Sequence, residues 1–93
     1  MDLQVSDRGW VLFTKEHCKY CDKAKALLPE AERVPCDAYL TSNRDEFLEQ
    51  MDRLSGREYR TFPMVFYNGK FVGGYTETAK RFEQEKAFSF VAF

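Results

Sequence analysis

Residues 10–21 have the sequence WVLFTKEHCKYC, and this stretch decides the fold. It opens with a short, nearly continuous run of aromatic and branched side chains, which is typical of a strand buried on both faces of a sheet. Apolar residues then recur at helical spacing from Cys21 onward, until Pro29 ends the helix. The sequence therefore predicts a buried strand over 10–14 and, after a short loop, a helix over 21–28.

The middle of the chain predicts a second strand and a second helix. Residues 33–36 are a weaker strand candidate, and Pro35 favours the edge of a sheet over its centre. Ser42 or Asn43 can cap a helix that begins near residue 41, and Gly56 closes it. The apolar positions of this helix recur at spacings of three and four residues and are Phe47, Leu48, Met51 and Leu54.

The last third of the chain predicts a hairpin followed by a helix. Residues 64–67 and 70–72 flank Asn68-Gly69, the dipeptide that best suits the two positive φ angles of a type I′ turn. Thr76 then opens a polar helix, whose narrow inward stripe consists of Ala79 and Phe82. Residues 87–93 have no predicted element.

The element order is strand, helix, strand, helix, hairpin, helix. Two strands joined through a helix are expected to run parallel, with a right-handed crossover between them. The antiparallel hairpin then completes a mixed sheet. The sequence contains no internal repeat and no segment typical of a domain linker. We expect one α/β domain over residues 1–93 with the thioredoxin fold, in which three helices cover a four-stranded mixed sheet.

Composition narrows the range of partners. Apolar residues make up 44% of the chain and charged residues 31%, as in ordinary globular proteins, and the formal net charge is -1 with both signs interleaved. We therefore expect no nucleic-acid partner. The first residues lack the pattern of a secretory signal, and no apolar run is long enough to span a bilayer, so we expect a cytoplasmic protein without a membrane partner.

Three cysteines are an odd number for the disulfide framework of a small secreted domain. Cys18 and Cys21 form a Cys-x-x-Cys pair between a buried strand and a helix start, which indicates redox chemistry. Backbone N–H groups and the helix dipole at such a position lower a cysteine pKa from about 8.5 to about 3.5–7.5, and Lys15 and Lys19 add positive charge. We expect Cys18 to be the nucleophile and Cys21 the shielded, resolving thiol.

Other interpretations of the cysteines are less favoured. A Cys-x-x-Cys pair is also half of a zinc site, but a second pair of ligands is missing, because Cys36 stands alone and His17 is adjacent to Cys18. We therefore expect no metal. Cys36 is expected to be a small buried apolar residue rather than a third redox thiol, and His17 is expected to point away from Cys18 rather than act as its base.

Three motifs together resemble the glutaredoxin family of the dithiol type, with the pair separated by Lys-Tyr. They are Cys18-Lys19-Tyr20-Cys21, Thr61-Phe62-Pro63 and Gly73-Gly74-Tyr75-Thr76-Glu77, and a lysine lies three residues before the first cysteine. The resemblance extends from about Val11 to Phe82. Two positions depart from the family pattern, since Lys19 replaces a proline and Glu77 replaces an aspartate.

The resemblance implies a glutathione site. It implies a cis peptide bond at Pro63, a backbone contact from the preceding residue to the cysteinyl part of glutathione, and a helix start that holds the γ-glutamyl end. Arg57 and Arg60 stay unassigned, because the segment from Gly56 to Thr61 is longer than the common pattern. The implied glutathione-binding residues are Lys15, Tyr20, Thr61, Phe62, Pro63, Gly74, Thr76 and Glu77.

The function that the resemblance implies is glutathione-dependent reduction of protein disulfides and glutathione mixed disulfides. The expected partners of this monomer are glutathione and disulfide-containing or glutathionylated proteins, with ribonucleotide reductase among the candidates. A binding-class alternative is an iron-sulfur cluster held by Cys18 and glutathione in a dimer. A third, less favoured interpretation is a redox-inert interaction domain.

Overall fold

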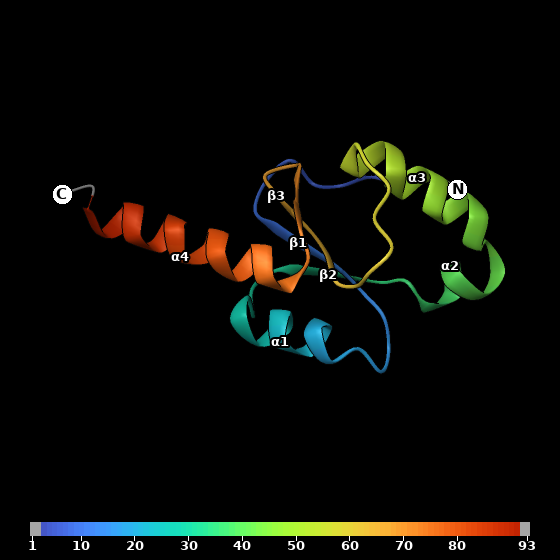
Figure 1. Cartoon of the computed structure of the whole chain (residues 1–93), viewed down its shortest axis with the longest axis horizontal. Helices are drawn as coiled ribbons and strands as arrows, with labels where there is room; N and C mark the ends of the chain where they lie inside the picture. The colour runs from blue at the N-terminus through green and yellow to red at the C-terminus, as the bar shows by residue number, and fades with distance from the viewer. Residues whose placement is uncertain (1–2, 92–93) are drawn as a thin grey trace.

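Within residues 3–91, the range that this computed structural model describes, four strands form one sheet in the order β2-β1-β3-β4. β1 is parallel to β2 and antiparallel to β3, and β3 is antiparallel to β4. The sheet is therefore mixed, as predicted, and β1 is paired along both edges. The elements are β1 Trp10–Thr14, α1 Lys19–Leu27, β2 Glu32–Pro35, α2 Asp37–Ser42, α3 Arg44–Ser55, β3 Met64–Tyr67, β4 Lys70–Gly73 and α4 Tyr75–Val91 (Figure 1).

Alternation along β1 divides the core into two layers. Val11 and Phe13 pack with Phe47 and Met51 of α3, whereas Leu12 points to the opposite face and packs with residues of α1 and α4. Figure 1 shows α1 and α3 on opposite sides of the strands. Full burial of an apolar side chain of this size contributes about 1.5–3 kcal/mol, so both layers stabilise the position of β1.

The structure contains four helices among residues 3–91, one more than the three predicted. The additional helix, α2, covers Asp37–Ser42, and α3 begins only at Arg44, after Asn43. Asn43, one of the two predicted caps, is the N-cap residue of α3, but its side chain makes no capping hydrogen bond. Gly56 ends α3 in the left-handed conformation, with φ 78°, as predicted.

The hairpin between β3 and β4 has the predicted turn. Asn68 has φ 51° and Gly69 has φ 81°, the two positive values that a type I′ turn requires. The turn is tied to the residue before β1, because Gly9 donates to Asn68 Oδ1 at 2.8 Å and its carbonyl accepts from the Asn68 amide at 2.9 Å. Trp10 stacks on Tyr67 beside it, with ring centroids 4.2 Å apart.

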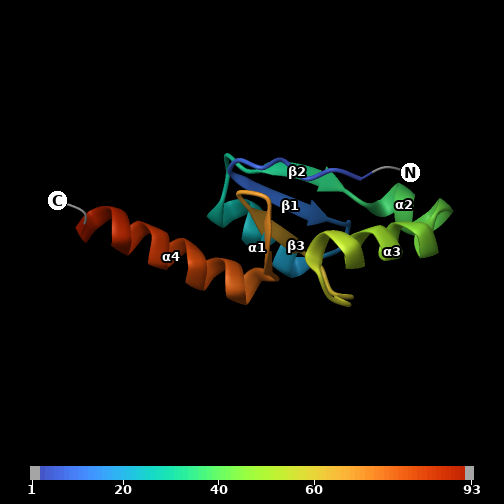
Figure 2. The ribbon, with the colours of Figure 1, turned by 90° about the horizontal axis from the view of Figure 1, so that it is seen from above.

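Helix α4 begins at Tyr75, one residue before the predicted start, and continues to Val91. It therefore covers most of the segment for which no element is predicted, and residues 92–93 lie outside the described range. Figures 1 and 2 both show α4 projecting beyond the sheet. Among residues 75–85 of this helix, Thr78 is the one that is fully buried, whereas the predicted inward residues are Ala79 and Phe82. None of the helices within residues 3–91 has the length and apolarity required to cross a membrane.

Thr78 offers a test of this packing, since its Oγ1 is buried and has no hydrogen-bond partner among the described residues. We predict that Thr78→Val raises the free energy of unfolding by about 1 kcal/mol, because it removes an unsatisfied hydroxyl and keeps the β-branched shape. Urea unfolding measures the change.

The matched control is Thr41→Val, whose hydroxyl donates to the Asp37 carbonyl at 3.0 Å at an exposed site. This control is expected to give no gain in stability. Equal gains in both variants, or a loss at Thr78, would contradict the assignment.

Candidate functional site

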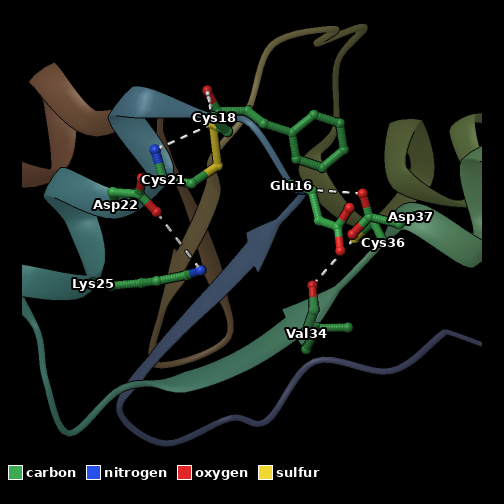
Figure 3. Close-up of a disulfide and its surroundings, with 9 residues drawn as sticks. Glu16, Cys18, Cys21, Asp22, Lys25, Val34, Cys36 and Asp37 are labelled. Atoms are coloured by element: carbon green, nitrogen blue, oxygen red, sulfur yellow. Dashed lines mark hydrogen bonds and ion pairs between the residues drawn. A yellow bond between two sulfur atoms is a disulfide. The ribbon is translucent and has the colours of Figure 1, made fainter.

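A disulfide joins Cys18 and Cys21 at the start of α1, with their Cα atoms 5.2 Å apart. Figure 3 shows this yellow bond where the chain enters the helix, while Cys36 lies apart from it beside the carbonyl of Val34. The predicted redox pair is thus brought together, and the third cysteine is not part of it.

Cys18 is the N-cap residue of α1. Its backbone is extended, with φ -122° and ψ 100°, and its Sγ accepts a hydrogen bond from the Cys21 amide at 3.1 Å. The helix therefore begins at Lys19, two residues before the start predicted from the apolar spacing. A sulfur in this position receives an amide hydrogen and lies at the positive end of the helix dipole, so negative charge on it is stabilised once the bond is reduced.

The two sulfurs differ in accessibility. Cys18 retains 8% of its surface, whereas Cys21 is 0% exposed. Thiol-disulfide exchange requires direct approach to a sulfur, and only Cys18 offers one. The roles of attacking and resolving thiol stay predictions, which this difference in exposure supports.

A groove of about 240 Å³ adjoins the disulfide. Phe62 connects the two features, because its carbonyl oxygen lies 3.6 Å from Cys18 Sγ and its side chain lines the groove. The lining residues come from α1, from the segment before β3 and from the start of α4. They are Tyr20, Tyr59, Thr61, Phe62, Gly74, Tyr75, Thr76 and Glu77, six of which are among the eight residues predicted to bind glutathione.

The other two predicted residues lie next to the groove. The Lys15 ammonium lies 5.7 Å from the centre of the Phe62 ring, so a cation stands beside a residue that lines the groove. Pro63 is fully buried behind Phe62, and the peptide bond between them is cis, as the resemblance implies. All eight predicted residues are therefore gathered at one site.

Glu77 has a structural contact that the sequence does not predict. Its Oε1 accepts a hydrogen bond from the Gly74 amide at 2.8 Å, which is the reach-back half of a capping box. One carboxylate oxygen of Glu77 thus caps α4, while the side chain still lines the groove.

Tyr59 and Tyr75 are groove residues that the sequence reasoning missed. Tyr75 belongs to the motif Gly73-Gly74-Tyr75-Thr76-Glu77, and its place between predicted binding residues could have indicated that it lines the groove. Its ring centre lies 6.0 Å from that of Tyr20. Tyr59 belongs to the lengthened segment after Gly56, whose path cannot be derived from a motif. Its ring makes an edge contact with Phe71 at 5.0 Å.

The two unassigned arginines have different surroundings. Arg60 forms a two-pronged pair with Asp52, at 2.7 and 3.1 Å, and these hydrogen bonds lower the pKa of the Asp52 carboxyl. The Arg57 guanidinium instead lies over the rings of Tyr59 and Phe71, at 5.3 and 5.6 Å. Arg57 is therefore the arginine beside the groove.

Cys36 is buried, as predicted, at 0% exposure. Burial is the main reason that its pKa is raised to about 12, although a backbone hydrogen bond from Thr14 opposes the shift. His17 is exposed in the loop before Cys18 with a left-handed φ of 55°. Among residues 3–91, no group of three or more His, Cys, Asp or Glu side chains is arranged to hold a metal ion.

Known proteins resemble this chain in sequence and in fold. The glutaredoxin family model matches residues 10–72. Glutaredoxin-C4 of Arabidopsis thaliana is 37% identical over 81 residues, an alignment that covers 85% of this chain and 58% of that protein. The chain thus spans less than two thirds of this relative's length.

Solved structures share the fold. Glutaredoxin 1 of Francisella tularensis, in complex with cacodylate, superimposes with a TM-score of 0.71 at 22% identity, covering 85% of this chain and 96% of that one. The buckwheat glutaredoxin-glutathione complex gives a TM-score of 0.69 at 24% identity, covering 94% and 79%. The α/β architecture with a four-stranded mixed sheet is therefore the glutaredoxin and thioredoxin fold.

The contrast between the cysteines predicts selective alkylation. In the reduced, folded protein we expect iodoacetamide to label Cys18 rapidly near neutral pH and to leave Cys36 unlabelled even near pH 10, where an ordinary thiol is ionised. Mass spectrometry of the digested protein identifies the labelled residues. Labelling of Cys36 at the rate of Cys18 would contradict this assignment, and protein unfolded in urea, with every thiol accessible, is the control.

The Cys36 shift also predicts a pH dependence of stability. Above the ordinary value of 9.0 the unfolded chain releases the Cys36 proton, whereas the folded chain retains it up to about 12. Stability is therefore lost as the pH rises through this window.

Proposed function

The chain belongs to the glutaredoxin family, and on that premise we propose that it is a thiol-disulfide oxidoreductase that takes its electrons from glutathione. Its substrates are protein disulfides and mixed disulfides between proteins and glutathione. The observation that carries the proposal is the Cys18 sulfur, which is the accessible member of a disulfide at a helix N-terminus and adjoins a groove.

The first step is attack by the reduced Cys18. Its thiolate forms a bond to the glutathione sulfur of a mixed disulfide, the substrate S–S bond breaks, and the substrate thiolate leaves and takes a proton from water. The Cys21 amide, 3.1 Å from Cys18 Sγ, supports the thiolate before the attack. A second glutathione then attacks the Cys18 adduct, which releases glutathione disulfide and restores the thiolate.

Protein disulfides follow a second route. Cys18 first joins one substrate sulfur, and Cys21 then attacks Cys18, releases the reduced substrate and closes the intramolecular disulfide. The complete burial of Cys21 supports this order, because external disulfides cannot reach it. Two glutathione molecules restore the dithiol, so each cycle oxidises two thiols for each disulfide reduced.

The groove supports glutathione as the donor. A peptide-like thiol lying along it has the Lys15 cation near Phe62 at one end and the first turn of α4 at the other. Glutathione carries a carboxylate at each end, so both ends find complementary charge or backbone N–H groups. A glutathione complex of the similarly folded buckwheat protein lends support to this choice.

The protein partners of the proposed activity stay predictions. They are disulfide-containing and glutathionylated proteins, with ribonucleotide reductase as a candidate. The monomeric state, the cytoplasmic location and the absence of nucleic-acid and membrane partners are also predictions.

A coupled assay tests the proposal. The purified, reduced protein is supplied with glutathione, glutathione reductase and NADPH, and NADPH oxidation is followed after a glutathione mixed disulfide is added. Turnover above the rate without protein is expected. Folded protein without turnover would reject glutathione-dependent reduction and favour cluster binding or another electron donor.

We predict that cysteine variants separate the two routes. Cys18→Ser is expected to abolish both activities, because it removes the nucleophile. Cys21→Ser is expected to retain reduction of glutathione mixed disulfides and to lose reduction of protein disulfides, as measured with a glutathionylated peptide and with a disulfide-bonded protein. Equal loss of both activities in both variants would contradict the division of roles.

A further inference from the structure

Tyr59 is held at the rim of the groove by contacts outside it. The segment between α3 and β3 carries this residue over β4, where its ring packs edge-on against Phe71 at 5.0 Å. The Arg57 guanidinium lies over both rings, 5.3 Å from the centre of the Tyr59 ring and 5.6 Å from that of Phe71. The ring is therefore fixed before any substrate binds, so little side-chain entropy is lost when its hydroxyl is used.

The Tyr59 hydroxyl reaches across to Gly74 at the start of α4. A Cβ on Gly74 would lie 2.6 Å from Tyr59 Oη, closer than real contacts allow. Gly74 does not have the left-handed backbone that favours glycine, so this approach is a reason for the absence of a side chain there. The hydroxyl occupies the space that a side chain at residue 74 would fill.

This hydroxyl has no hydrogen-bond partner among residues 3–91 and lines the groove. Two neighbouring polar groups are engaged elsewhere, since the Gly74 amide donates to Glu77 and Arg60 pairs with Asp52. A phenol hydroxyl is both donor and acceptor, so Tyr59 offers the groove an oriented hydrogen bond.

We propose that Tyr59 is a specificity-determining residue that donates a hydrogen bond from its hydroxyl to the part of the substrate lying over Gly74. In the arrangement proposed above, on which this inference rests, that part is the γ-glutamyl end of glutathione. A site built to hydrogen-bond one group discriminates against analogues that lack it. Tyr59 thus favours glutathione mixed disulfides over disulfides of thiols without a γ-glutamyl group.

The test compares two substrates made from one peptide. In the first, the peptide cysteine is joined to glutathione; in the second, it is joined to cysteinylglycine, which lacks the γ-glutamyl group. Tyr59→Phe removes only the hydroxyl and keeps the ring between Phe71 and Arg57. We expect KM for the glutathione substrate to rise about fivefold to tenfold with kcat unchanged, and both constants for the cysteinylglycine substrate to stay at wild-type values.

The matched control is Tyr67→Phe, which removes a tyrosine hydroxyl from the ring that stacks on Trp10. It is expected to leave the preference for the glutathione substrate unchanged. If Tyr59→Phe keeps the wild-type preference, or loses activity equally on both substrates, the proposed role of Tyr59 is wrong. Turnover of the glutathione substrate by the wild-type protein would still support the proposed function in that case. A folded wild-type protein that fails on both substrates overturns the proposed function and this inference with it.

Discussion

Burial of β1 on both faces and along both edges is the constraint on which the site depends. The strand is paired with β2 on one side and β3 on the other, and its side chains alternate between two core layers, so neither its register nor its direction can vary. Because β1 is fixed, the short loop after Thr14 places Cys18 just beyond the C-terminal end of this central strand. The antiparallel neighbour of β1, β3, begins two residues after Phe62, and the Phe62 carbonyl oxygen lies 3.6 Å from the Cys18 sulfur. The redox pair and the groove thus meet through a strand that takes no part in the chemistry.

The sequence predicts most of the fold where a local physical rule is strong. The Asn68-Gly69 turn, the buried run of β1 and the helical spacing of α3 each follow from such a rule, and the structure confirms them. Helix α2 was missed because it has only six residues, and its Tyr39 and Leu40 are ordered by packing against the core rather than by a repeating pattern. The burial of Thr78 is not predicted for a related reason, because the pattern of apolar residues does not identify a polar residue on a buried helix face.

In the site, too, the residues that belong to short sequence motifs are predicted, whereas a residue brought there by contacts between distant parts of the chain is not. Residues named from short motifs lie together, because each motif is attached to the end of a strand or the start of a helix whose position the sheet determines. Tyr59 has no such attachment; it reaches the groove because a lengthened segment packs onto Phe71, which is a contact between distant parts of the chain. Glu77 illustrates a further limit of prediction from residue type alone. A carboxylate beside a groove suggests a ligand contact. One oxygen of Glu77, however, already accepts a hydrogen bond from the Gly74 amide and caps α4.

The three cysteines show how environment, rather than residue type, assigns chemical roles. Thiol-disulfide exchange requires a thiolate and a path by which the other sulfur can approach it. At Cys18 the amide hydrogen bond favours the thiolate, and the exposed surface provides the path. Cys21 lacks the path but touches Cys18, so its only accessible partner is intramolecular. Cys36 lacks both, because burial closes the path and raises its pKa to about 12. A thiol left reactive at that position would compete with Cys21 for mixed disulfides or be lost to oxidation. Cys36 instead lies just after β2, in the core layer that contains Phe47 and Met51 of α3, so the redox chemistry is confined to the pair at the helix start.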